Sequence, residues 1–219
     1  MKTFLNKLLK NFVLVYSWPY LPWHLVAIVA TYFLVTLGLD WYYFSLTRSL
    51  DISWLWVPAG ILGGLLPILI PAVLFVIAKY HKDQDLFSKS LVLAQAAMLG
   101  WLVSSIYKVF TGRIPPDLTN SAIDTSHGFR FGFWEGGIFW GWPSSHTTVA
   151  FAMVISFLVL GSVSRKAKYL AFIYALYIGF GASIGFHWFS ESFAGVVIGT
   201  IVGVVVGRSY KLKNASINS

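Results

Sequence analysis

Residues 54–80 read WLWVPAGILGGLLPILIPAVLFVIAKY, and this stretch decides the class of protein. It carries no charged side chain before Lys79. A helix rises about 1.5 Å per residue and a bilayer core is about 30 Å thick, so the stretch is long enough to cross a membrane. Pro58, Pro67 and Pro71 give the helix places to bend, and its length allows it to tilt.

The rest of the chain has the same character. Apolar residues make up 57% of the 219 and charged residues 11%, with a mean hydropathy of +0.71. Soluble domains contain about 45–50% apolar and about 25% charged residues. We predict membrane spans at residues 23–46, 54–80, 86–107, 145–163, 169–186 and 189–207. The expected fold is therefore all-α, a polytopic membrane protein with six transmembrane helices.

The net charge of +8 follows the expected topology. In a six-helix arrangement the basic residues divide into a large and a small group. The large group is Lys2, Lys7, Lys10, Lys79, Lys82, Lys89, Arg165, Lys166, Lys168, Arg208, Lys211 and Lys213. The small group, on the other side, is Arg48, Lys108, Arg113 and Arg130. The positive-inside rule places the larger group and both termini in the cytoplasm, so the basic charge does not indicate nucleic-acid binding.

Three segments complete the expected organisation. Residues 1–22 predict an amphipathic helix on the cytoplasmic membrane surface, and the alternative is a basic tail leading into the first span. The apolar face of that helix is formed by Leu5, Leu8, Leu9, Phe12 and Tyr16. The six-helix domain covers residues 23–207, with a long extracytoplasmic loop at residues 109–142, and residues 208–219 form a polar cytoplasmic tail. The chain has no cysteine, which excludes disulfides and thiol ligands.

Residues 108–116 read KVFTGRIPP and stand at the end of the third expected span. Lys108 and Arg113 carry positive charge there and can bind an anion. The alternative is that both side chains reach toward lipid headgroups.

Residues 142–146 read WPSSH and open the fourth expected span. The first turn of a helix has free N–H groups and a partial positive charge, which together favour an anion. Ser144 and Ser145 add hydroxyl donors, and His146 can exchange a proton near neutral pH. The alternative is a helix N-cap followed by an interfacial histidine.

Residues 187–191 read HWFSE. Residues four apart share one face of a helix, so Glu191 can accept the Nδ1 proton of His187 and leave Nε2 with a free lone pair. A histidine held in this way is suited to nucleophilic attack. The alternative is a helix-surface pair with no chemical role.

The three segments fall on the same expected side of the membrane and together describe phosphoryl transfer. A lysine, an arginine and helix N–H groups suit a phosphate, one histidine can attack phosphorus, and the other can protonate the leaving oxygen. No cluster of carboxylates is available for Mg²⁺ or Zn²⁺. The sequence therefore predicts a metal-free and cofactor-free reaction through a phosphohistidine.

These segments resemble the signature of the type 2 phosphatidic acid phosphatases, which are related to vanadium haloperoxidases. That signature is Lys, six residues, Arg-Pro; then Pro-Ser-Gly-His; then Ser-Arg, five residues, His, three residues, Asp. Lys108 and Pro116 match its first block, the run PSSH at residues 143–146 matches the second with one change, and His187 matches the third. The resemblance covers roughly residues 86–207.

Three positions depart from the family pattern. The arginine of the first block falls at Pro115, the Ser-Arg pair falls at Phe180 and Gly181, and the final aspartate is Glu191. Two of the cations that bind phosphate in the family are therefore missing at their usual places. Arg113 is the expected substitute because it is the nearest cation in the same block, and Arg130 in the long loop is the second choice.

The resemblance implies an integral-membrane phosphatase acting on a lipid phosphate or lipid diphosphate. It implies catalytic roles for His187, His146 and Glu191, and phosphate binding by Lys108, Arg113, Ser144 and Ser145. The expected partners are the lipid substrate and membrane lipids, in the cell (inner) membrane, with the site on the extracytoplasmic face. Phosphatidate, phosphatidylglycerol phosphate, polyprenyl diphosphate and lipid A phosphates all fit. Two alternatives stay open, namely a lipid phosphotransferase and a non-catalytic lipid-binding relative.

Overall fold

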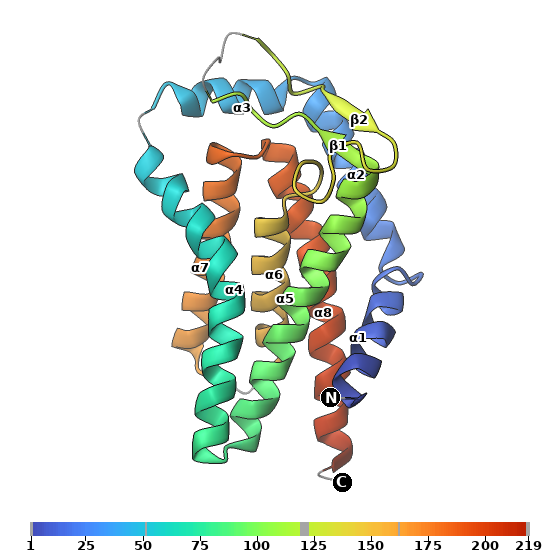
Figure 1. The fold of residues 1–219 in the computed structure, drawn as a ribbon, viewed down its shortest axis with the longest axis vertical. Helices are drawn as coiled ribbons and strands as arrows, with labels where there is room; N and C mark the ends of the chain where they lie inside the picture. Colours follow the sequence, from blue (N-terminus) through green and yellow to red (C-terminus); the bar gives the residue numbers. More distant parts are fainter. Residues whose placement is uncertain (1, 51, 119–122, 162, 218–219) are drawn as a thin grey trace.

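The structure, a computed structural model, describes residues 2–50, 52–118, 123–161 and 163–217. Outside the described residues lie residues 1, 119–122, 218 and 219, which belong to the predicted N-terminal helix, loop and tail, and residue 162, which belongs to the predicted span at residues 145–163. Most of the described chain is helical (Figure 1). The helices are α1 (Lys2–Val15), α2 (Leu21–Thr36), α3 (Leu39–Arg48), α4 (Ser53–His81), α5 (Gln84–Phe110), α6 (Ser145–Leu160), α7 (Arg165–Gly185) and α8 (Phe189–Ile217).

Helices α4 to α8 run along the long axis of a bundle, and both chain ends lie in its lower half (Figure 1). Four helices, α4, α5, α7 and α8, are long and apolar enough to cross a membrane, and the pair α2–α3 makes a fifth if it is one bent span. Helix α6 has only 16 residues because it ends at Gly161, whose φ of +82° belongs to the left-handed region. The described residues thus include four to five candidate spans, and six crossings remain a prediction.

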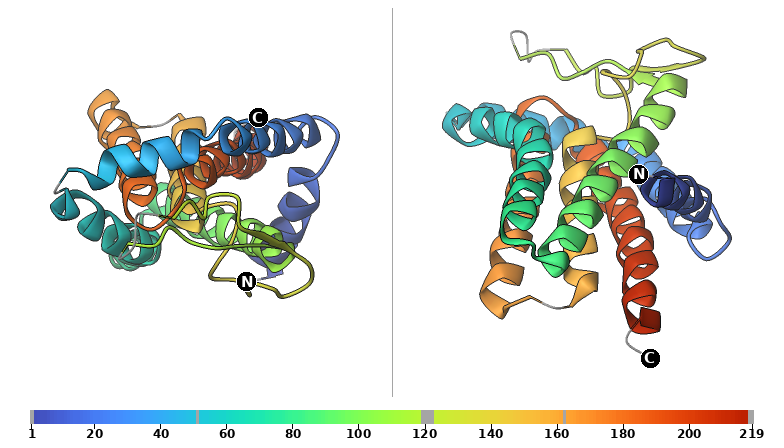
Figure 2. Two further views of the ribbon diagram at one scale, coloured as in Figure 1. Left: turned by 90° about the horizontal axis from the view of Figure 1, so that it is seen from above. Right: turned by 60° about the horizontal axis from the view of Figure 1, so that its bottom comes forward.

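The first expected span, residues 23–46, is not one straight helix. Helix α2 ends at Thr36, and Gly38 has a φ of +70°, a left-handed conformation that glycine adopts without steric cost. Helix α3 then departs at 66° from α2 and crosses the upper end of the bundle (Figure 2). This bend places Asp40 of α3 at that end.

The long loop after α5 contains a small hairpin, so the fold is not purely α. Strand β1 (Thr111–Arg113) pairs antiparallel with β2 (Phe129–Phe131), and Gly112 lies opposite Arg130. The hairpin lies at the same end of the bundle as α3 (Figure 1). It fixes the direction of the chain just after Lys108.

Helix α1 packs against the bundle through one face. Asn11 is buried and donates to Gln95 Oε1 of α5 at 2.7 Å and to Ser209 Oγ of α8 at 3.0 Å. The opposite face exposes Leu5, Leu9 and Val13. The helix is therefore present with its apolar outer face, and its position relative to a membrane surface remains a prediction. The tail expected from residue 208 continues as helix through Ile217.

A row of glycines on α8 lets α6 approach closely. A Cβ added at Gly195 would meet Thr147 Cβ at 2.8 Å, and one at Gly203 would meet Ala152 O at 2.7 Å. Gly199 and Gly207 also face α6. Small residues at this spacing permit close helix packing, and here the packing is inside the bundle. The contact holds the start of α6 against the start of α8.

Candidate active site

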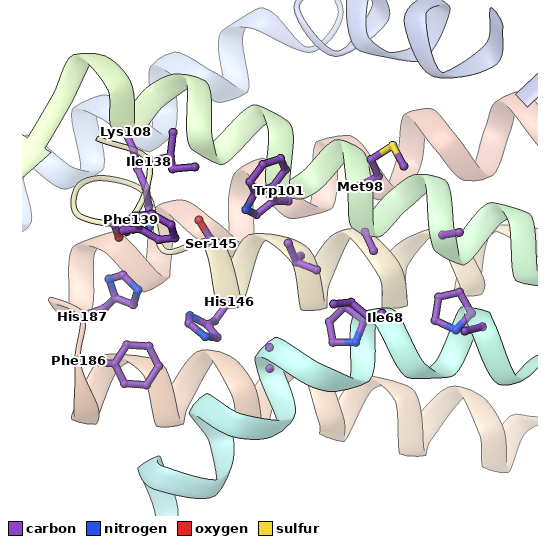
Figure 3. A pocket seen from close by; sticks show the side chains of 18 of the residues that line it. Ile68, Met98, Trp101, Lys108, Ile138, Phe139, Ser145, His146, Phe186 and His187 are labelled. Atoms are coloured by element: carbon purple, nitrogen blue, oxygen red, sulfur yellow. Dashed lines mark hydrogen bonds between the residues drawn. The ribbon is translucent and has the colours of Figure 1, made fainter. Parts of the chain in front are cut away.

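The three polar segments meet at the upper end of the bundle. Lys108 comes from the last turn of α5, His146 from the first turn of α6, and His187 from the turn between α7 and α8. Ser144 N donates to Glu191 O at 3.0 Å, which joins the second segment directly to the third. Figure 3 shows Lys108, Ser145, His146 and His187 around one end of a cavity.

His187 and Glu191 form the pair that their spacing predicts. His187 Nδ1 lies 2.5 Å from Glu191 Oε2, and both side chains are buried. Because an ionised carboxylate only accepts hydrogen bonds, Nδ1 carries the proton and Nε2 keeps its lone pair. Burial lowers the pKa of His187, while the hydrogen bond that His187 donates to Glu191 opposes this shift. The geometry therefore favours a neutral, correctly oriented imidazole at neutral pH.

His146 faces the same cavity from α6. Its ring centre lies 6.2 Å from that of His187, and the edge of Phe186 packs against it at 4.9 Å between ring centres. No carboxylate pairs with His146 among the described residues. The two histidines are thus close enough to act on one phosphate from different sides. They differ in their partners, since His187 is bonded to a carboxylate and His146 packs against a phenyl ring.

Lys108 and Ser145 line the cavity, whereas Ser144 does not. Lys108 lines the cavity, and its ammonium donates to Phe139 O in the loop at 3.1 Å, which leaves further protons for a ligand. Ser145 also lines the cavity and lies 3.0 Å from Ser104 Oγ. Ser144 is the N-cap of α6, and its hydroxyl accepts from Thr147. It is not among the residues that line the cavity.

Arg113 does not reach the cavity, contrary to the expectation that it binds phosphate. The hairpin turns its guanidinium inward, where Nη2 donates to Asp40 Oδ2 at 2.7 Å and Nη1 donates to Ser190 Oγ at 2.9 Å. Nη1 also lies 3.5 Å from Glu191 Oε1. With these donors engaged, Arg113 stands behind the His187–Glu191 pair. Arg130, the second choice, is exposed on β2 and does not line the cavity either.

Gly181 shows why an arginine is absent from the third segment. A Cβ at this position would overlap Ala59 of α4 and would approach Leu55 O. Helix α4 therefore occupies the space that a side chain would need. Lys108 is the only Lys or Arg among the described residues that line the cavity.

Sequence reasoning missed two residues of the site. Asp40 and Ser190 are buried and connect Arg113 to the first turn of α8. One signal was available for Asp40, because an acidic residue inside an expected span is a functional candidate by default. Ser190 has no such signal, since a serine at a helix start is ordinary.

The described residues contain no group of three or more His, Cys, Asp or Glu side chains that could hold a metal ion. The cations near the two histidines are instead Lys108, at the cavity, and Arg113, behind Glu191. This arrangement can bind an anion and place it between two imidazoles.

Comparison with known proteins gives one family. The family model described as PAP2 superfamily matches residues 89–215, more than half of the chain. No curated protein and no solved structure matches. The matched region contains all three polar segments, and members of this superfamily are phosphatases, which supports phosphoric-ester hydrolysis in general terms. The chain therefore belongs to the PAP2 superfamily.

Proposed function

We propose that the protein is an integral-membrane phosphatase that hydrolyses a lipid phosphate or lipid diphosphate through a phosphohistidine, without a metal ion. His187 Nε2 attacks phosphorus and the bond to the leaving oxygen breaks. His146 gives its proton to that oxygen. Water then gives a proton to His146 as it attacks the phosphohistidine, the P–N bond breaks, and inorganic phosphate leaves with both histidines restored.

Few described groups are placed to bind the negative charge of the phosphate. Lys108 supplies the cation, and Ser145 with the free N–H groups of the first turn of α6 supplies hydrogen bonds. Preorganised donors around a transferring phosphoryl group supply much of the reduction in its barrier. Glu191 stabilises the positive charge that develops on His187. Ser144 caps α6 and so fixes the helix turn whose N–H groups face the phosphate.

The observation that carries the lipid assignment is the shape of the cavity. It has a volume of about 1060 Å³ and extends from His187 between α4 and α5 as far as Phe75 and Ser90. From Lys108 to Ser90 the rise of α5 amounts to about 27 Å, which exceeds one leaflet of a bilayer core of about 30 Å. Such a length fits a long hydrocarbon chain.

The walls of the cavity are suited to such a chain. Ile68, Met98 and Trp101 line it (Figure 3), and all three side chains are also exposed on the surface of the protein. A lipid can therefore enter sideways from the bilayer, with its phosphate at the histidines and its chain along α4 and α5. A water-soluble substrate would leave most of this apolar surface unused.

Phosphate release tests the proposal. Purified protein in detergent is expected to release phosphate from long-chain lipid phosphates in the presence of EDTA, and vanadate should block the reaction because it mimics pentacoordinate phosphorus. Glycerol phosphate should show a kcat/KM at least about 100-fold lower, since each buried methylene contributes about 0.8 kcal/mol. An absolute requirement for Mg²⁺ would refute the mechanism, and transfer of phosphate to a second lipid headgroup would indicate a phosphotransferase.

We also propose that the termini are cytoplasmic and that the site faces outward. The helix ends on either side of the turns after α4 and α6 lie at the end of the bundle opposite the site (Figure 1) and carry Lys79, Lys82, Lys89, Arg165, Lys166 and Lys168. Because the chain lacks cysteine, single-cysteine variants report the side directly. In intact cells an impermeant maleimide is expected to label Glu135→Cys, in the loop over the site. Lys166→Cys, at the start of α7, should react only after permeabilisation. The reverse pattern would invert the topology.

A further inference from the structure

Asp40 is a buried carboxylate that lies outside the residues matched by the family. It stands on α3, just beyond the bend at Gly38, and its relative exposure is 0%. It accepts three hydrogen bonds, from Arg113 Nη2 at 2.7 Å, from Ser190 N at 2.8 Å and from Ser190 Oγ at 2.5 Å. Burying a charge is costly unless it is paired and hydrogen-bonded, and both conditions hold here.

The contact with Ser190 anchors the helix that carries Glu191. Ser190 is the second residue of α8, and its N–H is one of the amides that have no partner within the helix. Asp40 Oδ1 accepts this hydrogen and so acts as a cap supplied by another helix. Glu191 is the next residue, so α3 fixes the position of the turn from which the carboxylate reaches His187.

The contact between Asp40 and Arg113 also fixes the position of the Glu191 carboxylate, from the side of the hairpin. The guanidinium also donates to Ser126 O, and its Nη1 faces Ser190 and Glu191. One buried cation thus lies between two buried carboxylates, Asp40 and Glu191. Without Asp40, Arg113 would have Glu191 as its remaining anionic partner and would draw it away from His187, because an uncompensated buried charge seeks the nearest counter-charge.

We propose that Asp40 is a positioning residue for phosphoryl transfer: through Ser190 and Arg113 it holds Glu191 at the distance at which Glu191 orients His187. The inference rests on the proposed function and deepens it. It predicts a specific effect on chemistry, since Asp40 touches neither the cavity nor the phosphate. His187 gains positive charge as it binds phosphorus, and Glu191 must be in place at that moment.

The variant Asp40→Asn tests this role because it keeps the shape and removes the charge. In one orientation its amide N–H₂ would face Arg113 Nη2 and in the other Ser190 N, so in either case two donors would oppose each other. We expect kcat and the rate of phosphohistidine formation to fall about 10- to 100-fold, the loss typical of one charged hydrogen bond, with KM changed by less than about twofold. The measurements are steady-state kinetics, acid-labile phosphohistidine and thermal unfolding of each purified variant.

Asn11→Ala is the matched control. Asn11 is equally buried, makes two hydrogen bonds and lies at the other end of the bundle, so its loss should lower stability and leave kcat unchanged. Ser190→Ala serves if Asp40→Asn does not fold, with an expected fall in kcat of about threefold to tenfold. A normal kcat in the folded variant, or a raised KM with an unchanged kcat, would overturn the assignment.

The same data separate the two proposals. A wild-type protein that neither releases phosphate nor forms phosphohistidine refutes the proposed function. A wild-type protein that forms phosphohistidine at the same rate as Asp40→Asn refutes only the role of Asp40.

Discussion

His187→Ala is expected to abolish turnover of every phosphate ester and to leave no phosphoenzyme. His187 lines the cavity and is the histidine with a carboxylate behind it, so no other described side chain at the site offers a prepared nucleophile. In enzymes that form a covalent intermediate, loss of the nucleophile costs at least about 10⁴-fold in kcat. The measurement is phosphate release together with acid-labile phosphate bound to the purified protein.

His127, another histidine at the same end of the bundle, provides the control for loss of an imidazole that is not at the site. His127 is exposed in the loop, and its contact with Asp124 is 3.9 Å long. His127→Ala should therefore retain the activity and the phosphoenzyme of the wild type. Phosphohistidine that persists in His187→Ala would show that another residue attacks phosphorus.

His146→Ala is expected to separate substrates by their leaving groups. The leaving oxygen of an alkyl lipid phosphate needs a proton, and general acid catalysis contributes about 10²- to 10⁴-fold. That of p-nitrophenyl phosphate needs none. The rate of phosphoenzyme formation should therefore fall by about that factor for the lipid and far less for the nitrophenyl ester.

The comparison must use phosphoenzyme formation, because His146 also stands where it can act as base in the second step. Its ring lies 6.2 Å from that of His187 and faces the same cavity. Equal losses on both substrates would reject the acid role. The nitrophenyl ester thus serves as the internal control for folding of the variant.

The sequence predicted the membrane class from local apolar runs, and it predicted the meeting of the three segments because the expected topology places all three at one side of the membrane. Long apolar runs define the helices, and the four-residue spacing brings Glu191, in the first turn of α8, to His187, which stands just before that helix. The catalytic roles of His146, His187 and Glu191 stay predictions. The PAP2 superfamily match confirms the family that the segments indicated.

What the sequence did not predict depends on contacts between distant segments. Arg113 was assigned to phosphate because it is close in sequence to a missing arginine, yet the hairpin turns it toward Asp40. The first span was read as continuous because its length fits one crossing, while the break depends on the backbone at Gly38. Hydropathy alone contains neither the direction of a side chain nor the angle of a bend.

The division of the cavity between two parts of the chain has an evolutionary consequence. One wall is α4, which precedes the matched residues 89–215, whereas the histidines and Lys108 lie within them. The α4 wall combines Gly63, Gly64, Pro67, Pro71 and Ala72 with the larger Ile68 and Phe75, so small residues set part of its shape. For the proposed lipid substrate, selection can therefore change the fit of the hydrocarbon chain by exchanging residues of α4, while the residues proposed for the chemistry, encoded further along the gene, stay the same.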